Sequence, residues 1–370
     1  MNFDVLVVGA GLAGATTANL LANKGKKVLV VEKRKNIAGN CYDFKNADNI
    51  TIHKYGPHIF HTNDSKIWSF INQFGEFNQY QHRVLSYVQG QYVPFPVNTN
   101  TIEKLFGKSI SVDQLKEFLE NEVKVSSYNA PVRNFRDAVV SQVGERLYQL
   151  FFENYTRKQW AIDPQEISAE VATRIPIRLD RDERYFSDRF QGIPIKGYTS
   201  VISEMLSHSN ISILLGTDYF HLSNWIKTNL TVYTGKLDEF FNKKHGELTY
   251  RSLNLSFKTI DKEIYQPTAV VNYPNDYDWT RITEFKHFLG EKSAKTTLLY
   301  EYPCEVGEPY YVVLTDENLQ RRAKYLDEAT NMERSGKYLF IGRLAEYKYY
   351  NMDQVIEAAI NKVSGWEKSQ

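Results

Sequence analysis

A glycine motif near the start of the chain has the spacing of a dinucleotide site. Residues 9–14 read Gly-x-Gly-x-x-Gly and lie between the apolar run Asp4–Val8 and a helical pattern over residues 13–23. Such glycines permit a tight turn, close approach of a pyrophosphate to the backbone, and close packing of helix on strand. The helix N-terminus then offers N–H groups to the phosphates. The predicted contacts in this turn are Gly9, Gly11, Leu12, Ala13 and Gly14.

The next strand, Val28–Val31, ends at an acidic residue that suits the ribose of an adenosine. Glu32 is followed by Lys33, Arg34 and, a few residues on, Gly39 and Asn40. This order resembles the glutathione-reductase-like FAD flavoproteins and favours FAD over NAD. We expect Arg34 near the adenosine or phosphates, with a solvated surface arginine as the alternative.

Two later segments support the same cofactor. Thr231–Gly235 resembles the later strand of that fold, and the turn at Gly342 and Arg343 resembles its last glycine turn, where a backbone N–H meets the flavin side. The resemblance therefore implies FAD at three separate places in the chain.

The overall charge is nearly balanced. Lys and Arg total 45, Asp and Glu total 44, and the net charge is +1. Such balance gives no reason to expect nucleic acid or a membrane surface as a partner, so local cations must hold any anionic substrate. The two cysteines, Cys41 and Cys304, fit neither a disulfide framework nor a metal site. We expect a cytoplasmic protein, without a metal or a bilayer-spanning segment.

Five further motifs point to one family. They are Lys54–Thr62, Asn154–Trp160, Tyr185–Pro194, Thr280–Glu284 and Tyr347–Tyr349. Together, and in this order along essentially the whole chain, they resemble the bacterial UDP-galactopyranose mutases.

The resemblance implies an isomerase that interconverts UDP-galactopyranose and UDP-galactofuranose. In that family the N5 atom of reduced FAD is a nucleophile that attacks the anomeric carbon, and UDP leaves. The sugar ring then opens and recloses through a different hydroxyl, and UDP returns. Covalent catalysis by the cofactor explains a flavin in a reaction without net redox change.

The same resemblance implies the residues that hold the substrate. Arg174 and Arg281 would grip the diphosphate, because a guanidinium offers a charged planar fork of donors. Tyrosine hydroxyls would donate hydrogen bonds to the same phosphates. Aromatic rings would stack on the uracil and line the site beside the sugar. Surface or ion-paired arginines and core-packed rings are the alternatives. The predicted substrate residues are Phe151, Phe152, Tyr155, Thr156, Trp160, Arg174, Tyr185, Asn272, Arg281, Tyr311 and Tyr349.

Two histidines lie in a glycine-containing turn that faces the flavin in the family. His58 and His61 would stabilise the reduced flavin or assist proton movement during ring opening. With Arg174 and Arg281 they form the predicted catalytic set. Residues 161–179, which carry Arg174, resemble the family's mobile lid. The remaining predicted cofactor contacts are His58, Ile59, Gly342, Arg343, Tyr349 and Met352.

The periodicity of the chain places these residues on a mixed α/β fold. Residues 101–165 read as helical, residues 196–235 as α/β, and residues 248–314 as antiparallel strands. A strand at Tyr338–Ile341 and a helix at Met352–Val363 end the chain. The predicted parts are a Rossmann-like FAD-binding domain (1–80, 195–240, 335–370), an inserted helical domain (100–180) and an antiparallel sheet domain (81–99, 181–194, 245–330).

Several alternatives stay open on the sequence. Many relatives have Asp where this chain has Asn351, so UDP-N-acetylgalactosamine or another UDP-hexose is a second candidate substrate. A flavin amine oxidase shares the fold but needs an apolar aromatic cage rather than paired arginines. An FAD-binding regulator would show no turnover, and an NAD-dependent epimerase would need a Tyr-x-x-x-Lys pair. The resemblance also implies a homodimer. The sequence shows no NAD(P)H-binding motif separate from the FAD site, so we expect an external, unidentified reductant.

Overall fold

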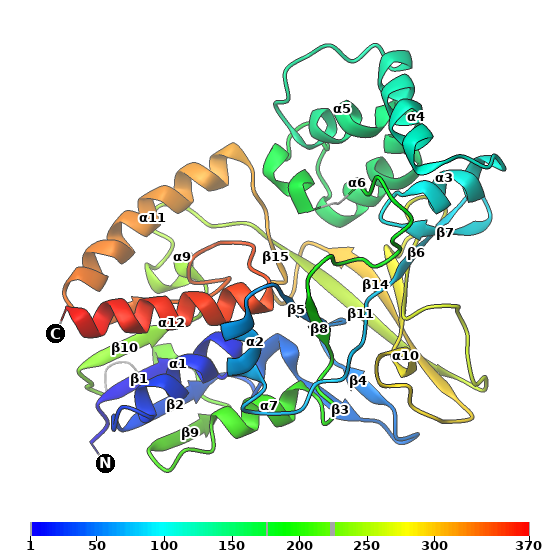
Figure 1. The fold of residues 1–370 in the computed structure, drawn as a ribbon. Coiled ribbons are helices and arrows are strands. Elements are labelled where there is room, and N and C mark those ends of the chain that lie inside the picture. Colours follow the sequence, from blue (N-terminus) through cyan, green and yellow to red (C-terminus); the bar gives the residue numbers. More distant parts are fainter. Residues whose placement is uncertain (1, 175–176, 223–225, 370) are drawn as a thin grey trace. The chain divides into compact units, whose positions relative to one another are not determined.

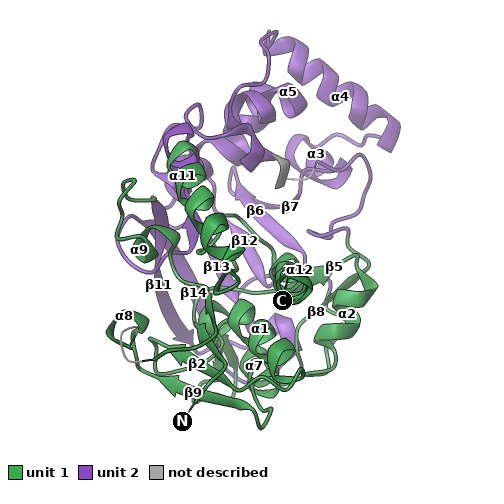
Figure 2. Ribbon diagram, turned by 90° about the vertical axis from the view of Figure 1, so that its left-hand side faces the viewer, with its two compact units in different colours: residues 1–80, 188–248, 320–370 green, residues 81–187, 249–319 purple. Residues whose placement is uncertain are grey.

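The computed structural model describes residues 2–174, 177–222 and 226–369, apart from the side chains of residues 173 and 174 (Figure 1). The chain divides into two compact units, coloured separately in Figure 2. Unit 1 comprises Met1–Tyr80, Asp188–Leu248 and Gln320–Gln370. Unit 2 comprises Gln81–Ser187 and Thr249–Leu319. Each unit therefore combines segments that are far apart in the sequence.

Unit 1 is built on a parallel sheet of five strands in the order β16-β10-β1-β2-β9. Its central strands are short apolar runs buried on both faces, which is typical of parallel sheets covered by helices. The strands are β1 (Val5–Val8), β2 (Val28–Glu32), β9 (Ile211–Leu215), β10 (Leu230–Tyr233) and β16 (Tyr338–Phe340). The predicted Rossmann-like α/β layer is confirmed.

Helices α1 (Leu12–Ala22) and α12 (Met352–Lys368) lie side by side (Figure 1), and their small apolar residues form one core with β1 and β2. Helix α12 continues five residues beyond the predicted end at Val363, to Lys368. The other elements of unit 1 are η1 (Gly39–Cys41), β3 (Asp43–Lys45), β4 (Thr51–His53), β5 (Phe60–Thr62), α2 (Ser65–Ile71), β8 (Phe190–Gly192), α7 (Tyr198–Met205), α8 (Tyr219–Leu222) and α9 (Leu237–Phe240).

Unit 2 contains a seven-stranded sheet in the order β15-β11-β14-β13-β12-β6-β7. It is antiparallel as predicted, except that β6 and β12 run parallel. A parallel pair requires a long connection between its strands, and the helical segment of this unit lies within that connection. The strands are β6 (Val84–Val88), β7 (Gln91–Phe95), β11 (Tyr250–Ile260), β12 (Val270–Asn272), β13 (Arg281–Glu284), β14 (Thr296–Cys304) and β15 (Tyr311–Val312).

The predicted helical region is present in unit 2. Polar side chains cap its helices: Asn98, Ser111 and Asn134 accept bonds from the first turns that follow them. Its elements are α3 (Thr99–Phe106), α4 (Val112–Val125), α5 (Phe135–Tyr148), a π-helical turn η2 (Gln149–Glu153), α6 (Asn154–Trp160) and a 3₁₀ turn η3 (Ala169–Arg174).

Two sequence expectations need correction. The strand expected over residues 280–287 ends at Glu284, and a helix, α10 (Lys286–Leu289), follows. The long helix α11 (Asp316–Arg334) was not predicted: it begins after the residues read as strands (248–314), within the bounds of the expected sheet domain (245–330). Helix α11 buries only a narrow stripe, which comprises Asn318, Tyr325 and Ala329. Most of its residues are polar, so the sequence lacks the apolar repeat every three to four residues that would predict a helix.

The chain forms two compact units, whereas the sequence analysis expected three domains. The helical region and the antiparallel sheet fall together in unit 2. Residues 188–194 fall in unit 1, where β8 pairs with β5. Among the described residues, no helix combines the length and apolar character needed to cross a membrane.

Candidate active site

Two glycines of the turn in unit 1, Gly9 and Gly14, leave no room for a larger side chain. Gly9 follows β1 with φ of +105°, and a Cβ there would lie 2.2 Å from Oγ1 of Thr234. A Cβ on Gly14 would lie 1.9 Å from the carbonyl oxygen of Gly9. Gly9 and Gly14 are therefore required by the packing of the turn and α1 on the sheet itself, whereas Gly11 is not.

Two further glycines meet this turn from other elements. A Cβ on Gly39 would lie 2.9 Å from Cα of Gly11, and a Cβ on Gly342 would lie 3.1 Å from Cβ of Ala13. Within the described chain, no side chain caps the N-terminus of α1 and no acidic residue lies in its first turn. A backbone without side chains, followed by a helix N-terminus whose N–H groups no carboxylate neutralises, fits the pyrophosphate of a dinucleotide.

Glu32 braces the same turn. Its side chain is buried, one carboxylate oxygen accepts the Ala10 N–H at 2.9 Å, and the other accepts the Arg34 N–H at 2.8 Å. A carboxylate oxygen has a second lone pair, so the predicted ribose contact is compatible with this role. The Arg34 side chain donates to Asn40 at 3.0 Å and lies 4.2 Å over the Tyr55 ring, so it is not a solvated surface group.

The other predicted cofactor residues of this region lie in unit 1 with different exposure. Lys33 is exposed on the surface after β2, whereas Asn40 and Ile59 are partly buried. The cofactor contacts of all three residues stay predictions.

The histidine turn is anchored by a residue that the sequence analysis missed. His53, on β4, accepts the His58 N–H on its Nδ1 at 3.1 Å. His58 Nδ1 lies 2.9 Å from the Gly56 carbonyl oxygen, so it donates there and leaves Nε2 as the acceptor. Burial lowers the pKa of His53 to about 3 and that of His58 to about 4, so both are neutral near pH 7.

This burial predicts a pH dependence of stability. A histidine with a depressed pKa in the folded state favours folding above about pH 6.5 and loses that contribution as the pH falls. Between about pH 6.5 and 4.5 we expect the free energy of unfolding to fall by about 2 kcal/mol more in the native protein than in His53→Gln. Glutamine keeps an acceptor for His58 but does not titrate. Urea unfolding at several pH values measures this, and equal slopes for the two proteins would contradict it.

His61, on β5, pairs with a carboxylate. Its Nδ1 lies 2.8 Å from Oδ2 of Asp188, and the two side chains are 12% and 21% exposed. Asp188 lies within the Tyr185–Pro194 motif, but the sequence analysis gave it no role. The sequence shows only that an acidic residue precedes β8. It does not show how β8 is aligned with β5, so the pairing with His61 could not be predicted.

The Gly342 turn uses its own N–H internally. Gly342 donates to Oε2 of Glu346 at 2.9 Å, and Oε1 of Glu346 accepts the Tyr350 hydroxyl at 3.1 Å. Any N–H offered to a cofactor must therefore come from elsewhere in the turn. The Arg343 guanidinium lies 4.7 Å over the Tyr349 ring, which brings these two predicted residues together.

Helix α12 begins directly after this turn. Asn351 is its N-cap and forms a capping box with Gln354, whose Oε1 accepts the Asn351 N–H at 2.9 Å. Asn and Asp are both strong N-caps, so Asn fits this position structurally. Met352, the first helical residue, packs partly against the core of unit 1.

In unit 2, the predicted anion-binding arginine lies in a row across the sheet. Asn272, Arg281 and Glu301 are register neighbours on β12, β13 and β14, so their side chains share one face. Arg281 Nε lies 3.2 Å from Oε2 of the buried Glu301, and its Nη2 lies 3.4 Å from the Tyr155 hydroxyl. Burial acts to lower the pKa of Arg281, but Glu301 outweighs it and holds that pKa well above its ordinary value.

Helix α6 brings three predicted residues to this unit. Tyr155 reaches Arg281, Thr156 is buried, and the Trp160 ring meets Tyr311 edge-on at 6.1 Å. Lys158 was not predicted, yet its Nζ lies 2.5, 2.8 and 3.2 Å from the carbonyl oxygens of residues 273, 277 and 279. This lysine ties α6 to the segment between Asn272 and Arg281.

Three aromatic predictions gather around Phe95. The Phe151 and Phe152 rings are buried, with centroids 6.2 and 5.9 Å from that of Phe95. This is the core packing held as the alternative, and their stacking role stays a prediction. Tyr185 is partly exposed, 6.2 Å from Phe95, and its N–H donates to the His82 carbonyl at 2.6 Å.

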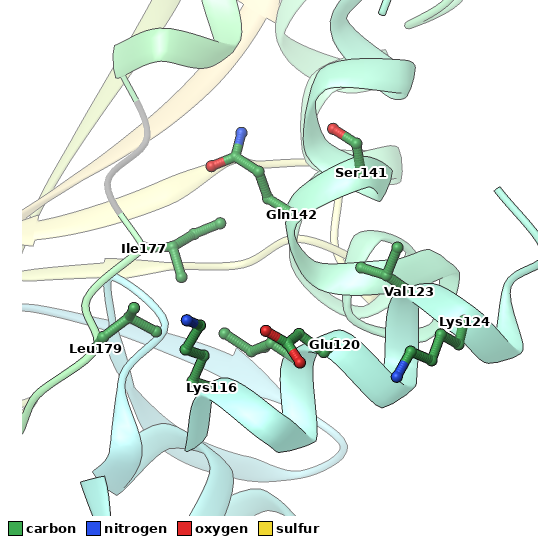
Figure 3. A pocket seen from close by; sticks show the side chains of 9 residues that line it. Lys116, Glu120, Val123, Lys124, Ser141, Gln142, Ile177 and Leu179 are labelled. Carbon is green, nitrogen blue, oxygen red and sulfur yellow. The ribbon is translucent and has the colours of Figure 1, made fainter. Parts of the chain in front are cut away.

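Two predictions fall outside the described part of the chain. The side chain of Arg174 is among those not described, and the lid expected over residues 161–179 includes residues 175 and 176. The pocket of about 470 Å³ in Figure 3 lies between α4, α5 and residues 177–179. None of the predicted site residues lines it.

Comparison with known proteins agrees with this layout. The family model for UDP-galactopyranose mutase matches residues 150–349, and that for the NAD(P)-binding Rossmann-like domain matches residues 7–74. A probable UDP-galactopyranose mutase of Klebsiella pneumoniae is 36% identical, covering 97% of this chain and 93% of its own. A dTDP-fucopyranose mutase of Escherichia coli is 35% identical, covering 96% of each chain. A crystal structure of reduced UDP-galactopyranose mutase has a TM-score of 0.77 at 17% identity, covering 99% of this chain and 94% of its own.

The glycine turn and parallel sheet of unit 1 define a Rossmann-type dinucleotide-binding protein. Identity to the Klebsiella relative over nearly the whole of both chains goes further than this shared fold. The chain belongs to the UDP-galactopyranose mutase family, an isomerase family that interconverts the two ring forms of a nucleotide sugar.

Proposed function

We propose that the protein converts UDP-galactopyranose to UDP-galactofuranose and back, with FAD as its cofactor in the reduced state. The observation that carries the proposal is Arg281, a charged guanidinium held in place by buried Glu301 and beside Tyr155. A fixed cation suits a leaving diphosphate, whose charge grows as the glycosidic bond breaks.

The glycine turns of unit 1 supply the cofactor half of the proposal. The residues that would hold FAD are those of the Gly9–Gly14 turn, with Glu32 and Arg34 for the adenosine and Gly342 and Arg343 for the flavin end. When bound, reduced FAD supplies N5 as a nucleophile for the anomeric carbon. The protein itself supplies a turn without side chains and a helix N-terminus for the pyrophosphate.

The histidine turn would serve proton movement. His58 presents Nε2 as an acceptor because its Nδ1 donates to Gly56, and His61 is likewise held at Nδ1, by Asp188. A neutral imidazole acceptor can take the hydroxyl proton that must move when the sugar ring opens. Asn272, Trp160 and Tyr311 would then orient the sugar diphosphate in unit 2.

A second candidate substrate follows from the relatives. The dTDP-fucopyranose mutase is nearly as similar to this chain as the Klebsiella relative, at 35% against 36% identity. The same ring contraction on a dTDP-hexose or on another UDP-hexose is therefore the alternative function. Arg281 recognises the diphosphate common to all of them, so it does not discriminate between these substrates.

The first test is turnover of UDP-galactofuranose, followed by chromatography, with and without dithionite. The visible spectrum of the protein is recorded first. A yellow protein that converts the substrate only when reduced is the expected result; dithionite without protein is the control. A yellow protein inert in both states would contradict the UDP-galactose assignment, and dTDP-fucofuranose and other UDP-hexoses would be tried next. The homodimer, cytoplasmic location, lid and external reductant stay predictions.

A further inference from the structure

His61 is held by a small network that joins two strands of unit 1. Strands β5 and β8 pair antiparallel, with His61 opposite Gln191. Asp188 lies two residues before β8, and its Oδ2 lies 2.8 Å from Nδ1 of His61. The contact places a carboxylate against one nitrogen of a candidate catalytic imidazole.

The carboxylate is itself fixed in orientation. Its second oxygen, Oδ1, accepts the Asn63 Nδ2–H at 2.7 Å, and Oδ1 of Asn63 accepts the Arg189 N–H at 2.9 Å. The Gln191 side chain donates to the Asp188 carbonyl at 2.9 Å. Both carboxylate oxygens of Asp188 therefore accept hydrogen bonds, and its backbone carbonyl accepts a third. These contacts fix the orientation of the carboxylate, which a simple ion pair between two strands would not need.

A carboxylate beside Nδ1 determines which nitrogen of a neutral imidazole carries the proton. Because an ionised carboxylate only accepts, Nδ1 must donate, and the lone pair lies on Nε2. His58 is held in the same tautomer by the Gly56 carbonyl oxygen. The two histidines of the turn therefore share one arrangement, reached through unrelated partners.

We propose that Asp188, oriented by Asn63, is a positioning residue that fixes His61 in the Nδ1–H tautomer and so makes Nε2 its proton acceptor in the reaction. The inference rests on the proposed function, in which His61 takes part in proton movement.

The tautomer can be measured directly on the full-length holoenzyme. Ring-¹⁵N-labelled histidine and long-range ¹H–¹⁵N correlation spectra at mildly alkaline pH distinguish the two tautomers, and His61→Gln identifies the His61 signals. We expect the Nδ1–H tautomer in the native protein. In Asp188→Asn the amide can donate to Nδ1, so the Nε2–H tautomer should replace it. Asp188→Glu, which keeps the carboxylate, should retain part of the native signal.

Kinetic measurements distinguish a role of Asp188 in orienting His61 from a purely structural role in holding β5 and β8 together. We expect Asp188→Asn to lower kcat about ten- to hundredfold, with KM changed less than about threefold. In the His61→Gln background the same substitution should cause no further loss, because residues that act as a unit are not additive. Glu333→Gln is the matched control: Glu333 pairs with Lys362 at 2.7 Å in unit 1 and has comparable exposure. It should lower thermal stability only.

Three results would overturn the inference: an Nε2–H tautomer in the native protein, an unchanged tautomer in Asp188→Asn, or additive losses in the double variant. If Asp188→Asn lost stability but kept the native kcat, Asp188 would have only a structural role in holding the two strands together. If the native holoenzyme converts no nucleotide sugar, the proposed function fails, and that outcome differs from an active enzyme indifferent to Asp188.

Discussion

Replacing Arg281 with alanine is expected to lower kcat about 10²–10³-fold, because it removes the fixed charge that we propose stabilises the leaving diphosphate. The expectation follows from its position: the guanidinium is held by Glu301 and Tyr155, and its side chain is only 24% exposed. Charge that is already oriented needs no reorganisation when the glycosidic bond breaks. Steady-state kinetics with reduced enzyme and the nucleotide sugar measures the effect.

The same substitution has a structural cost that must be separated from catalysis. Without Arg281, the Glu301 carboxylate is buried without a cation, which costs about 3–5 kcal/mol of folding stability. The double variant Arg281→Ala, Glu301→Gln should regain thermal stability but not turnover. Arg136→Ala breaks an ion pair of 2.6 Å with Glu145 in the same unit and is the control. Native kcat in folded Arg281→Ala would refute the role assigned to this arginine.

Replacing Gly11 with alanine is expected to weaken FAD binding about a hundredfold while leaving the fold intact. A Cβ at Gly11 meets Cα of Gly39 at 3.7 Å, an ordinary contact, and the backbone at Gly11 has a negative φ that alanine adopts. The methyl group would instead occupy the approach of the pyrophosphate. Losing one or two charge-assisted hydrogen bonds of about 1.5–3 kcal/mol each accounts for the magnitude. Titration of the apoprotein with FAD, followed by flavin fluorescence, measures it.

Two other glycines provide the comparison. Gly14→Ala would place a Cβ 1.9 Å from the Gly9 carbonyl oxygen, so it should impair folding itself. Gly365→Ala lies in α12, where a Cβ meets nothing within 4 Å among the described residues. It should raise stability by up to about 1 kcal/mol, because alanine favours the helix, and leave FAD affinity nearly unchanged. If Gly11→Ala binds FAD as tightly as Gly365→Ala does, the pyrophosphate does not lie against this turn.

Much of unit 1 could be predicted because its signals are local. The Gly9–Gly14 motif, the buried run ending at Glu32 and the helix after Gly14 lie within one short segment, where strand, turn and helix follow from neighbouring residues. The antiparallel strands of unit 2 could also be predicted, from alternation along β11 and from the β-branched and aromatic residues of β14. Helix α11 escaped notice because so few of its residues are buried.

Partnerships between distant residues could not be predicted in the same way. Arg281 was identified by its motif, but its pairing with Glu301 depends on the register of β13 and β14. His61 was identified likewise, whereas Asp188 reaches it only because β8 pairs with β5 across 127 positions of sequence. Register between strands depends on the packing of a whole face, and a shift by one residue reverses every side chain.

The residue types that could do chemistry, and the glycine spacing that a dinucleotide needs, can be read along the chain because they depend on neighbouring residues. Which partner orients each of those residues depends on the fold. The fold pairs Glu301 with Arg281 and Asp188 with His61, hydrogen-bonds His53 to the His58 N–H, and buries the Phe151 and Phe152 rings in a core. These contacts join segments separated along the chain, and only the folded sheets and turns bring their side chains within hydrogen-bonding or packing distance.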